Sequence, residues 1–132
     1  MRCPITSRKI HFSLAVLTLL LALPLLQGCA KSKQSQIVGS WRMPSPMYSI
    51  ILSLNADGTY TRGVGQDKAS VSAGESGAWR IDGSNLVMVP KVGLGAGKEC
   101  RFTISQLDSD KLVLTQTVMN LPTVQTYQRI GG

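Results

Sequence analysis

The sequence predicts an all-β fold, a small antiparallel eight-stranded meander barrel preceded by a signal-peptide helix and a flexible tether. Turn signals containing Asp with Gly or Ser recur at nearly equal spacing, near residues 57, 83 and 109. The segments around them alternate apolar and polar side chains, which is typical of strands with one buried face. After residue 29, no segment has the periodicity of a helix longer than one turn. Closing such a sheet into a barrel removes its exposed edges.

The amino-terminal segment has the composition of a signal peptide. Residues 1–11 are polar and basic, and the next fifteen, 12–26, are apolar apart from one serine, one threonine and one proline. Fifteen helical residues span about 22 Å, less than the roughly 30 Å of a bilayer's hydrocarbon core. This length favours a signal helix over a permanent transmembrane helix.

A short motif ends this apolar segment and reads Leu26-Gln27-Gly28-Cys29. It resembles the lipobox of bacterial lipoproteins, although Gln27 stands where that family prefers a smaller or β-branched residue. The resemblance implies cleavage between Gly28 and Cys29, attachment of a diacylglycerol to the Cys29 sulfur, and acylation of the new amino group. The signal peptide is then residues 1–28, and the acyl chains hold the mature protein at a membrane.

The residues after the cysteine bear on location and on the start of the domain. Residues 30 and 31 are Ala and Lys, and neither is the Asp that resembles an inner-membrane retention signal. The resemblance therefore implies the outer membrane, with the protein facing the periplasm. An ordinary secretory signal peptide with a coincidental cysteine is the alternative. The polar residues up to 36 predict a flexible tether over 29–36, followed by a domain over 37–132.

Eight strands are expected in this domain. They are a first strand, three hairpins and a last strand, at 40–43, 48–55 with 59–61, 78–81 with 86–89, 101–105 with 112–115, and 123–130. Six strands carry one aromatic residue each, which we expect in the core, namely Trp41, Tyr48, Tyr60, Trp79, Phe102 and Tyr127. Two stretches rich in small, polar or proline residues, 66–74 and 120–122, are expected to be mobile loops.

The first strand begins with a motif of its own, Gly39-Ser40-Trp41. It resembles the G-x-W motif of lipocalins and of shorter bacterial lipocalin-like domains, which residues 54–60 and 77–83 also resemble. The resemblance implies that Trp41 closes the base of the barrel and that Arg129 of the last strand packs over it. Such a cation–π contact contributes about 0.5 to 2 kcal/mol. The domain is much shorter than a true lipocalin, so we expect little cavity depth.

Composition argues against several classes of function. The formal net charge is +7, but three basic residues lie in the leader and no run of five basic residues follows it, so we expect no nucleic-acid binding. The one histidine, His11, also lies in the leader, which leaves the mature chain without an imidazole. The glycine-rich segment 93–98 departs from the phosphate-loop and dinucleotide patterns. We therefore expect no enzyme, no cofactor and no metal site.

The carboxylates and cysteines suit structural roles. Glu75 and Glu99 lie in separate segments and predict no acid–base pair. Cys3 leaves with the leader and Cys29 is consumed by lipid, so Cys100 is expected to be a small buried side chain or else a reactive thiol. Four aspartates fall at the expected turns, where their side chains cap backbone N–H groups, namely Asp57, Asp82, Asp108 and Asp110.

Two functions remain open at this point. In the first, the anchored barrel binds a small apolar ligand, which requires a pocket of at least about 300 Å³ open at one end. In the alternative, a filled barrel is a structural or interaction lipoprotein that contacts another envelope protein through its outer face or loops. Apolar residues on both faces of 86–89 and 112–114 favour the alternative, unless the chain itself covers the outward side chains.

Overall fold

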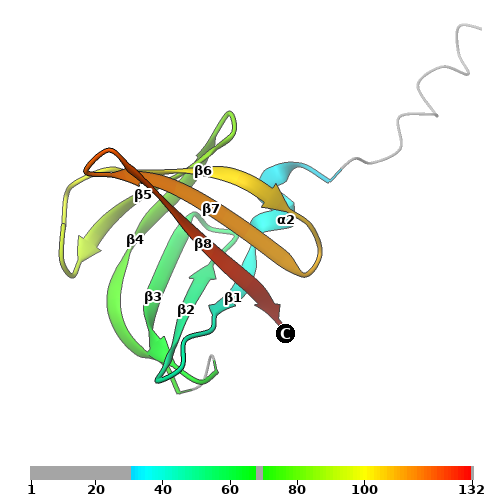
Figure 1. Ribbon diagram of the computed structural model, residues 1–132. Coiled ribbons are helices and arrows are strands. Elements are labelled where there is room, and N and C mark those ends of the chain that lie inside the picture. Colours follow the sequence, from blue (N-terminus) through cyan, green and yellow to red (C-terminus); the bar gives the residue numbers. More distant parts are fainter. Residues whose placement is uncertain (1–30, 68–69, 132) are drawn as a thin grey trace, which may run out of the picture. The chain divides into compact units, whose positions relative to one another are not determined.

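The computed structural model describes residues 31–67 and 70–131 (Figure 1). The expectations for the signal peptide, for cleavage after Gly28 and for lipidation of Cys29 lie outside these residues. No helix of the described chain is long and apolar enough to span a membrane. The elements are α2 Lys33–Ile37, β1 Gly39–Met43, β2 Ser49–Leu54, β3 Thr59–Gly65, β4 Ser72–Asp82, β5 Asn85–Val92, β6 Cys100–Leu107, β7 Lys111–Val118 and β8 Leu121–Ile130.

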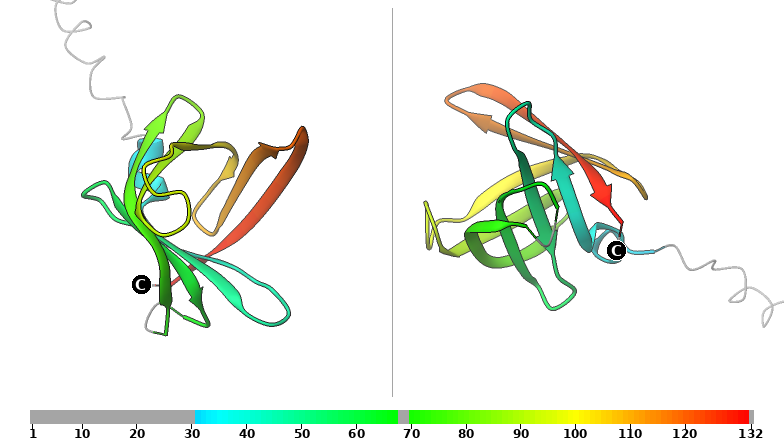
Figure 2. Two further views of the ribbon diagram at one scale, coloured as in Figure 1. Left: turned by 90° about the vertical axis from the view of Figure 1, so that its left-hand side faces the viewer. Right: turned by 90° about the horizontal axis from the view of Figure 1, so that it is seen from below.

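The eight strands form one closed antiparallel meander barrel, which confirms the predicted fold class. Every strand pairs with the next one along the chain, and β8 returns to pair with β1. This last contact is short, because only residues 128–130 of β8 pair with residues 40–42 of β1. In the left view of Figure 2, the β7–β8 and β1–β2 hairpins accordingly diverge toward their loops.

The connections fall at two opposite ends of the strands, as a meander requires. We call one the turn end. It contains α2 and the three tight turns at residues 55–58, 83–84 and 108–110. We call the other the loop end, which contains the connections at residues 44–48, 66–71, 93–99 and 119–120.

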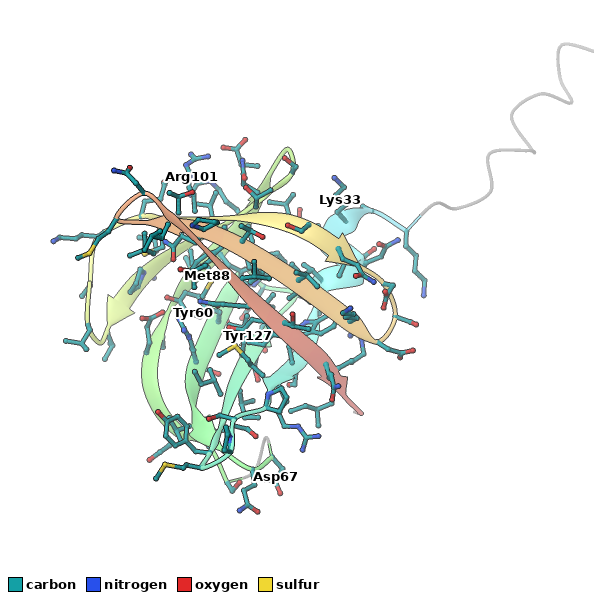
Figure 3. All side chains as sticks on the ribbon, in the orientation of Figure 1. Lys33, Tyr60, Asp67, Met88, Arg101 and Tyr127 are labelled. Atoms are coloured by element: carbon teal, nitrogen blue, oxygen red, sulfur yellow. The ribbon has the colours of Figure 1, made fainter. Side chains whose placement is uncertain are left out.

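The barrel interior is filled by side chains at alternating strand positions. Figure 3 shows Tyr60, Met88 and Tyr127 reaching into it from three strands. Five of the six aromatic residues expected in the core are there. Tyr48 is 52% exposed, because it precedes β2 and lies in the β1–β2 loop. The buried cluster consists of Ile37, Trp41, Leu52, Leu54, Tyr60, Trp79, Leu86, Met88, Phe102, Leu112, Leu114 and Tyr127.

Helix α2 corrects the last part of the flexible tether expected over 29–36, because residues 33–36 are helical. The side-chain oxygen of Ser32 accepts a hydrogen bond of 3.2 Å from the N–H of Ser35, which is a typical amino-terminal cap. At the other end of the helix, Ile37 is fully buried in the barrel core. A cap and one buried side chain stabilise this short helix, and neither produces a periodic sequence pattern.

Both expected mobile loops are shorter than predicted. In the stretch 66–74, β4 already begins at Ser72, and Asp67 Oδ1 accepts a hydrogen bond of 2.8 Å from the N–H of Ser70. In the stretch 120–122, β8 begins at Leu121. The turn before it consists of Met119 and Asn120, with φ of 50° and 63°. Positive φ at both positions is typical of a tight type I′ hairpin.

Candidate functional site

Trp41 and Arg129 close the barrel at the turn end. Arg129 Cζ lies 4.1 Å from the centre of the Trp41 ring, so the predicted contact is present. The Trp41 indole N–H donates a hydrogen bond of 2.8 Å to the carbonyl of Ile37. Trp41 is fully buried, and this end of the interior is therefore plugged.

Arg129 ties three segments together around the plug. Its Nη2 donates to the carbonyl of Gln36 at 2.6 Å, and its Nη1 donates to the carbonyl of Val38 at 3.0 Å. Its Nε donates to the carbonyl of Ser109 in the β6–β7 turn. A Cβ at Gly39 would lie 2.5 Å from Arg129 Nη1, and Gly39 has a φ of +141°. Both facts require glycine there, which explains the first residue of the predicted motif.

A surface groove lies beside this plug, between α2 and the β6–β7 turn. Its volume is about 530 Å³, and Lys31, Gln36, Leu107 and Asp108 contribute to its lining together with Arg129. The Arg129 guanidinium already donates to three carbonyls. The groove is outside the barrel and is therefore not the interior pocket that a ligand-binding barrel requires.

Polar side chains replace the apolar core toward the loop end. The Tyr60 hydroxyl donates a hydrogen bond of 2.7 Å to Glu75 Oε1, and the Tyr127 hydroxyl donates one of 2.8 Å to Gln125 Oε1. Burial raises the pKa of Tyr60, and the bond to the Glu75 carboxylate raises it further. Burial also raises the pKa of Tyr127. Both phenols therefore remain protonated hydrogen-bond donors at neutral pH.

Arg62 lies beside the Tyr60–Glu75 pair. It is opposite Glu75 in the register of β3 and β4, just before a bulge in their pairing. No ion pair among the described residues includes Arg62. It lines a pocket of about 200 Å³ together with Glu75, Ile50, Val64 and Leu94. This pocket is smaller than the roughly 300 Å³ typical of ligand sites, and the packed core lies beneath it.

Charged side chains cover the outer face of β5. Val87 faces outward between Arg80 of β4 and Arg101 of β6, yet it is fully buried. Glu99 bridges the two arginines, at 2.9 Å from Arg80 and 2.8 Å from Arg101. Asp82 pairs with Arg101 at 2.7 Å instead of capping the turn as expected. The aliphatic parts of the two arginine side chains thus cover Val87. Residues 86–89 therefore no longer favour docking through the outer face of the barrel.

Asp57 and Asp108 cap backbone groups as predicted, whereas the Asp110 carboxylate accepts no backbone hydrogen bond from a described residue. Asp57 accepts hydrogen bonds from the hydroxyl and the N–H of Thr59, which hold its pKa below the usual value. Asp108 accepts from the N–H groups of Asp110 and Lys111, and its pKa is lowered in the same way. Across residues 31–67 and 70–131, no group of three or more His, Cys, Asp or Glu side chains could hold a metal ion.

Cys100 is a free thiol at the first position of β6. It is half-buried and packs against the edge of the core, so it is less buried than expected. Its Sγ lies 3.9 Å from the carbonyl of Lys98. The structure thus gives Cys100 the position of a small packing residue at the rim.

The loop end carries the exposed large hydrophobic side chains. Met47 in the β1–β2 loop is 89% exposed, Leu94 in the β5–β6 loop is 96% exposed, and Met119 at the β7–β8 turn is 92% exposed. No large hydrophobic side chain within the described ranges is comparably exposed at the turn end. The others lie in the same loops or in the strand halves next to them, namely Tyr48, Val64, Val92, Val118, Leu121 and Val124.

The strand pattern of the sequence does not predict this concentration, because it places apolar residues in strands only. The signal that could have revealed it is an apolar residue between turn-forming residues. Met47 follows a proline, Leu94 lies between two glycines, and Met119 precedes an asparagine. None of these side chains continues the alternation of a strand into the core.

Cations accompany the exposed apolar residues. Arg42, Lys91 and Lys98 are exposed and form no ion pair with a described residue. Arg42 lines a recess of about 250 Å³ that Met47 and Tyr48 of the β1–β2 loop also line. The loop end therefore combines projecting apolar side chains with positive charges that the fold does not neutralise.

The chain matches no protein-family model, and no curated protein has significant similarity to it. The closed barrel is consistent with a lipocalin-like domain. The fold and its two ends define a class of protein, a small meander barrel that is plugged at its turn end and apolar with unpaired cations at its loop end.

Proposed function

We propose that the protein is a lipid-anchored, non-enzymatic docking module of the bacterial envelope. Its filled barrel is a rigid support, and its loop end contacts another envelope component. The observation that carries this proposal is the placement of the exposed apolar side chains at one end, opposite α2. Cys29 lies two residues before Lys31, within about 7 Å of chain. An anchor there attaches the turn end and leaves the loop end free.

The anchor is tested by mass spectrometry of the protein purified from native membranes. We expect a mature chain that begins at Cys29 and carries a diacylglycerol and an additional acyl chain. Density-gradient fractionation should place it with the outer membrane. The matched control is Cys29→Ser, which should keep residues 1–28 and lose the lipid. An unmodified Cys29 in the wild-type protein, or cleavage elsewhere, contradicts the anchor.

Docking is tested by placing a photoreactive amino acid at single positions of the full chain in living cells. We expect strong adducts from position 119 at the loop end and few from position 56, an exposed alanine in a turn of the other end. The adduct is then identified as lipid or protein. Equal or absent crosslinking at the two positions contradicts docking through the loop end.

Binding of a small ligand is the second candidate, and Arg62 is the observation that favours it. A ligand with an anionic group at Arg62 and a short apolar body against Ile50 and Leu94 suits the small pocket. Calorimetric titration with octanoate tests this, with Arg62→Gln as the control. A saturable heat of binding that is seen with the wild-type protein and is absent with Arg62→Gln supports a ligand site. Absent heat, or the same heat from Arg62→Gln, contradicts it.

A further inference from the structure

We infer that the loop end binds the surface of a second bilayer, which is rich in anionic phospholipid and separate from the one that holds the anchor at the turn end. The tips of three loops insert among the acyl chains, and the neighbouring cations contact the headgroups. This inference rests on the proposed docking function and names the component that is docked. It is argued from the shape of the loop end, from one strained residue and from the distribution of charge.

The apolar tips project separately. Met47, Leu94 and Met119 come from three different connections, and each is about nine-tenths exposed. A protein partner usually meets a contiguous packed patch, whereas single projecting side chains are surrounded on all sides when they enter a fluid layer of lipid. Methionine suits such insertion because its unbranched side chain adapts to irregular surroundings, and the leucine side chain is wholly apolar.

The hairpin that carries Met119 extends beyond the rest of the barrel. The pairing of β7 with β6 ends at Thr115, and β8 reaches β1 only at Gln128. Residues 116–124 therefore form a two-stranded arm, which stands apart from the other loops in Figure 2. A ribbon of two strands gains little stability alone. Its apolar residues add contact area beyond the barrel and no core packing.

Met119 is an unfavourable choice for the tip of this arm. Its φ is 50°, a region that glycine and asparagine adopt with much less strain than methionine. Its side chain is also 92% exposed, so the fold gains no packing from it. Folding alone does not explain a methionine at this position, whereas contact with an apolar phase does.

The charges at the loop end complement an anionic surface. Arg42 is next to the Met47 tip, and Lys91 and Lys98 flank the Leu94 tip along the chain. No carboxylate of the described residues forms an ion pair with these three cations. Glu99 is bound by two arginines and Glu75 by the Tyr60 hydroxyl, and Asp67 accepts from the N–H of Ser70. Unpaired lysines and arginines beside apolar tips favour anionic lipid.

The barrel can be tested without the lipid anchor. Residues 31–132 form a compact unit, within which the barrel closes and the core cluster is complete. The purified unit is mixed with vesicles of phosphatidylglycerol and phosphatidylcholine in equal parts, or of phosphatidylcholine alone, and the bound fraction is measured by flotation. We expect about tenfold stronger partitioning into the anionic vesicles. Absence of binding to anionic vesicles overturns the inference.

Insertion is tested with a triple variant, Met47→Ser, Leu94→Ser and Met119→Asn. All three positions are exposed, so folding should be unchanged by circular dichroism. We expect partitioning into anionic vesicles to fall by about tenfold, because three apolar side chains no longer enter the bilayer. Wild-type binding by the folded variant overturns the inference.

Orientation is tested with a matched pair of charge variants. Lys91→Gln with Lys98→Gln removes two charges at the loop end, and Lys31→Gln with Lys111→Gln removes two at the turn end. The net charge of the two variants is equal, so undirected attraction would weaken both alike. We expect about fivefold weaker binding for the loop-end pair and less than twofold for the turn-end pair. Equal weakening overturns the inference.

Tryptophan reporters give an independent readout of depth. Met119→Trp should shift its emission to the blue when anionic vesicles are added, whereas Ala56→Trp at the turn end should not. A failure of the vesicle experiments together with protein adducts from position 119 in cells contradicts lipid as the partner and keeps the proposed docking. A failure of both contradicts docking itself.

Discussion

The same eight strands form the turn end and the loop end. The side chains at the two ends differ in how many bonding and packing partners the fold gives them. At the turn end, the Trp41 indole and the Arg129 guanidinium bond backbone carbonyls, and they also contact each other. At the loop end, Met47, Leu94 and Met119 face water. The contacts that stabilise the fold are therefore concentrated at the turn end, whereas the docking that we propose is at the loop end.

This difference is large in energetic terms. A large apolar side chain gains about 1.5–3 kcal/mol when it is fully buried, and the loop-end side chains gain almost none of this in the folded monomer. They can be replaced with little loss to the fold, whereas the turn-end residues cannot. Substitutions at the two ends should therefore differ in their effect on the free energy of unfolding.

The largest effect is expected for Trp41→Ala. Trp41 is fully buried, and its removal leaves a cavity and an unpaired carbonyl at Ile37. We expect a loss of about 3–5 kcal/mol in the free energy of unfolding, measured by urea denaturation. The control at the loop end is Met119→Ala, which should change stability by less than about 0.5 kcal/mol. Equal losses in the two variants would abolish the distinction between the ends.

Arg129→Ala should have the next largest effect. It removes the cation–π contact and three charge-assisted hydrogen bonds around the plug, and we expect a loss of about 2–3 kcal/mol. The melting temperature should fall by roughly 10 °C, while export is unchanged. Arg129→Lys keeps the charge but loses the planar fork, so it should recover less than half of the loss. An unchanged melting curve for Arg129→Ala contradicts this role.

The sequence predicts much of the turn end, because that end depends on local signals. Asp-containing turns and strand alternation are readable from residue types and their order, and the Trp41–Arg129 contact follows from the resemblance of Gly39-Ser40-Trp41 to the lipocalin motif. Helix α2 could not be read in this way, because it depends on the Ser32 cap, on the burial of Ile37 and on the bond from Arg129 to Gln36. The burial of Ile37 and the bond from Arg129 are tertiary contacts between residues far apart in the chain.

The loop end was predicted poorly for two physical reasons. A bulge in the β3–β4 pairing follows the Arg62–Glu75 pair, where Gly63 is opposite Ala73, and one extra residue reverses the alternation on which a sequence argument relies. The short pairing between β8 and β1 leaves the β7–β8 arm free. The side-chain pattern of one strand does not determine its register with a strand that lies far away in the chain. The exposure of Met119 at the end of this arm follows from the second reason.

Alkaline pH should lower the free energy of unfolding through the two tyrosines in the part of the interior nearer the loop end. The pKa of Tyr60 and that of Tyr127 are raised in the folded protein, so an unfolded phenol loses its proton near pH 10 while the folded one keeps it. Stability from both tyrosines is therefore fully present below about pH 10 and is lost as pH rises above it, by at most about 1.4 kcal/mol per pH unit for each tyrosine. Urea denaturation from pH 8 to 11 measures this slope. Tyr60→Phe should reduce it, and an equal slope in both proteins contradicts the assignment to Tyr60.

The smallest expected effect is a gain in stability, and it tests most directly whether the two ends have different roles. Met119→Asn places a residue that tolerates positive φ at a position with a φ of 50°, so stability should rise by about 0.5–1 kcal/mol. The same substitution removes an apolar tip, so binding to anionic vesicles should fall. Denaturation and flotation on one preparation measure both changes. A variant that is more stable and binds less shows that Met119 is maintained for contact at the expense of the fold, whereas a less stable variant shows that the methionine serves the turn.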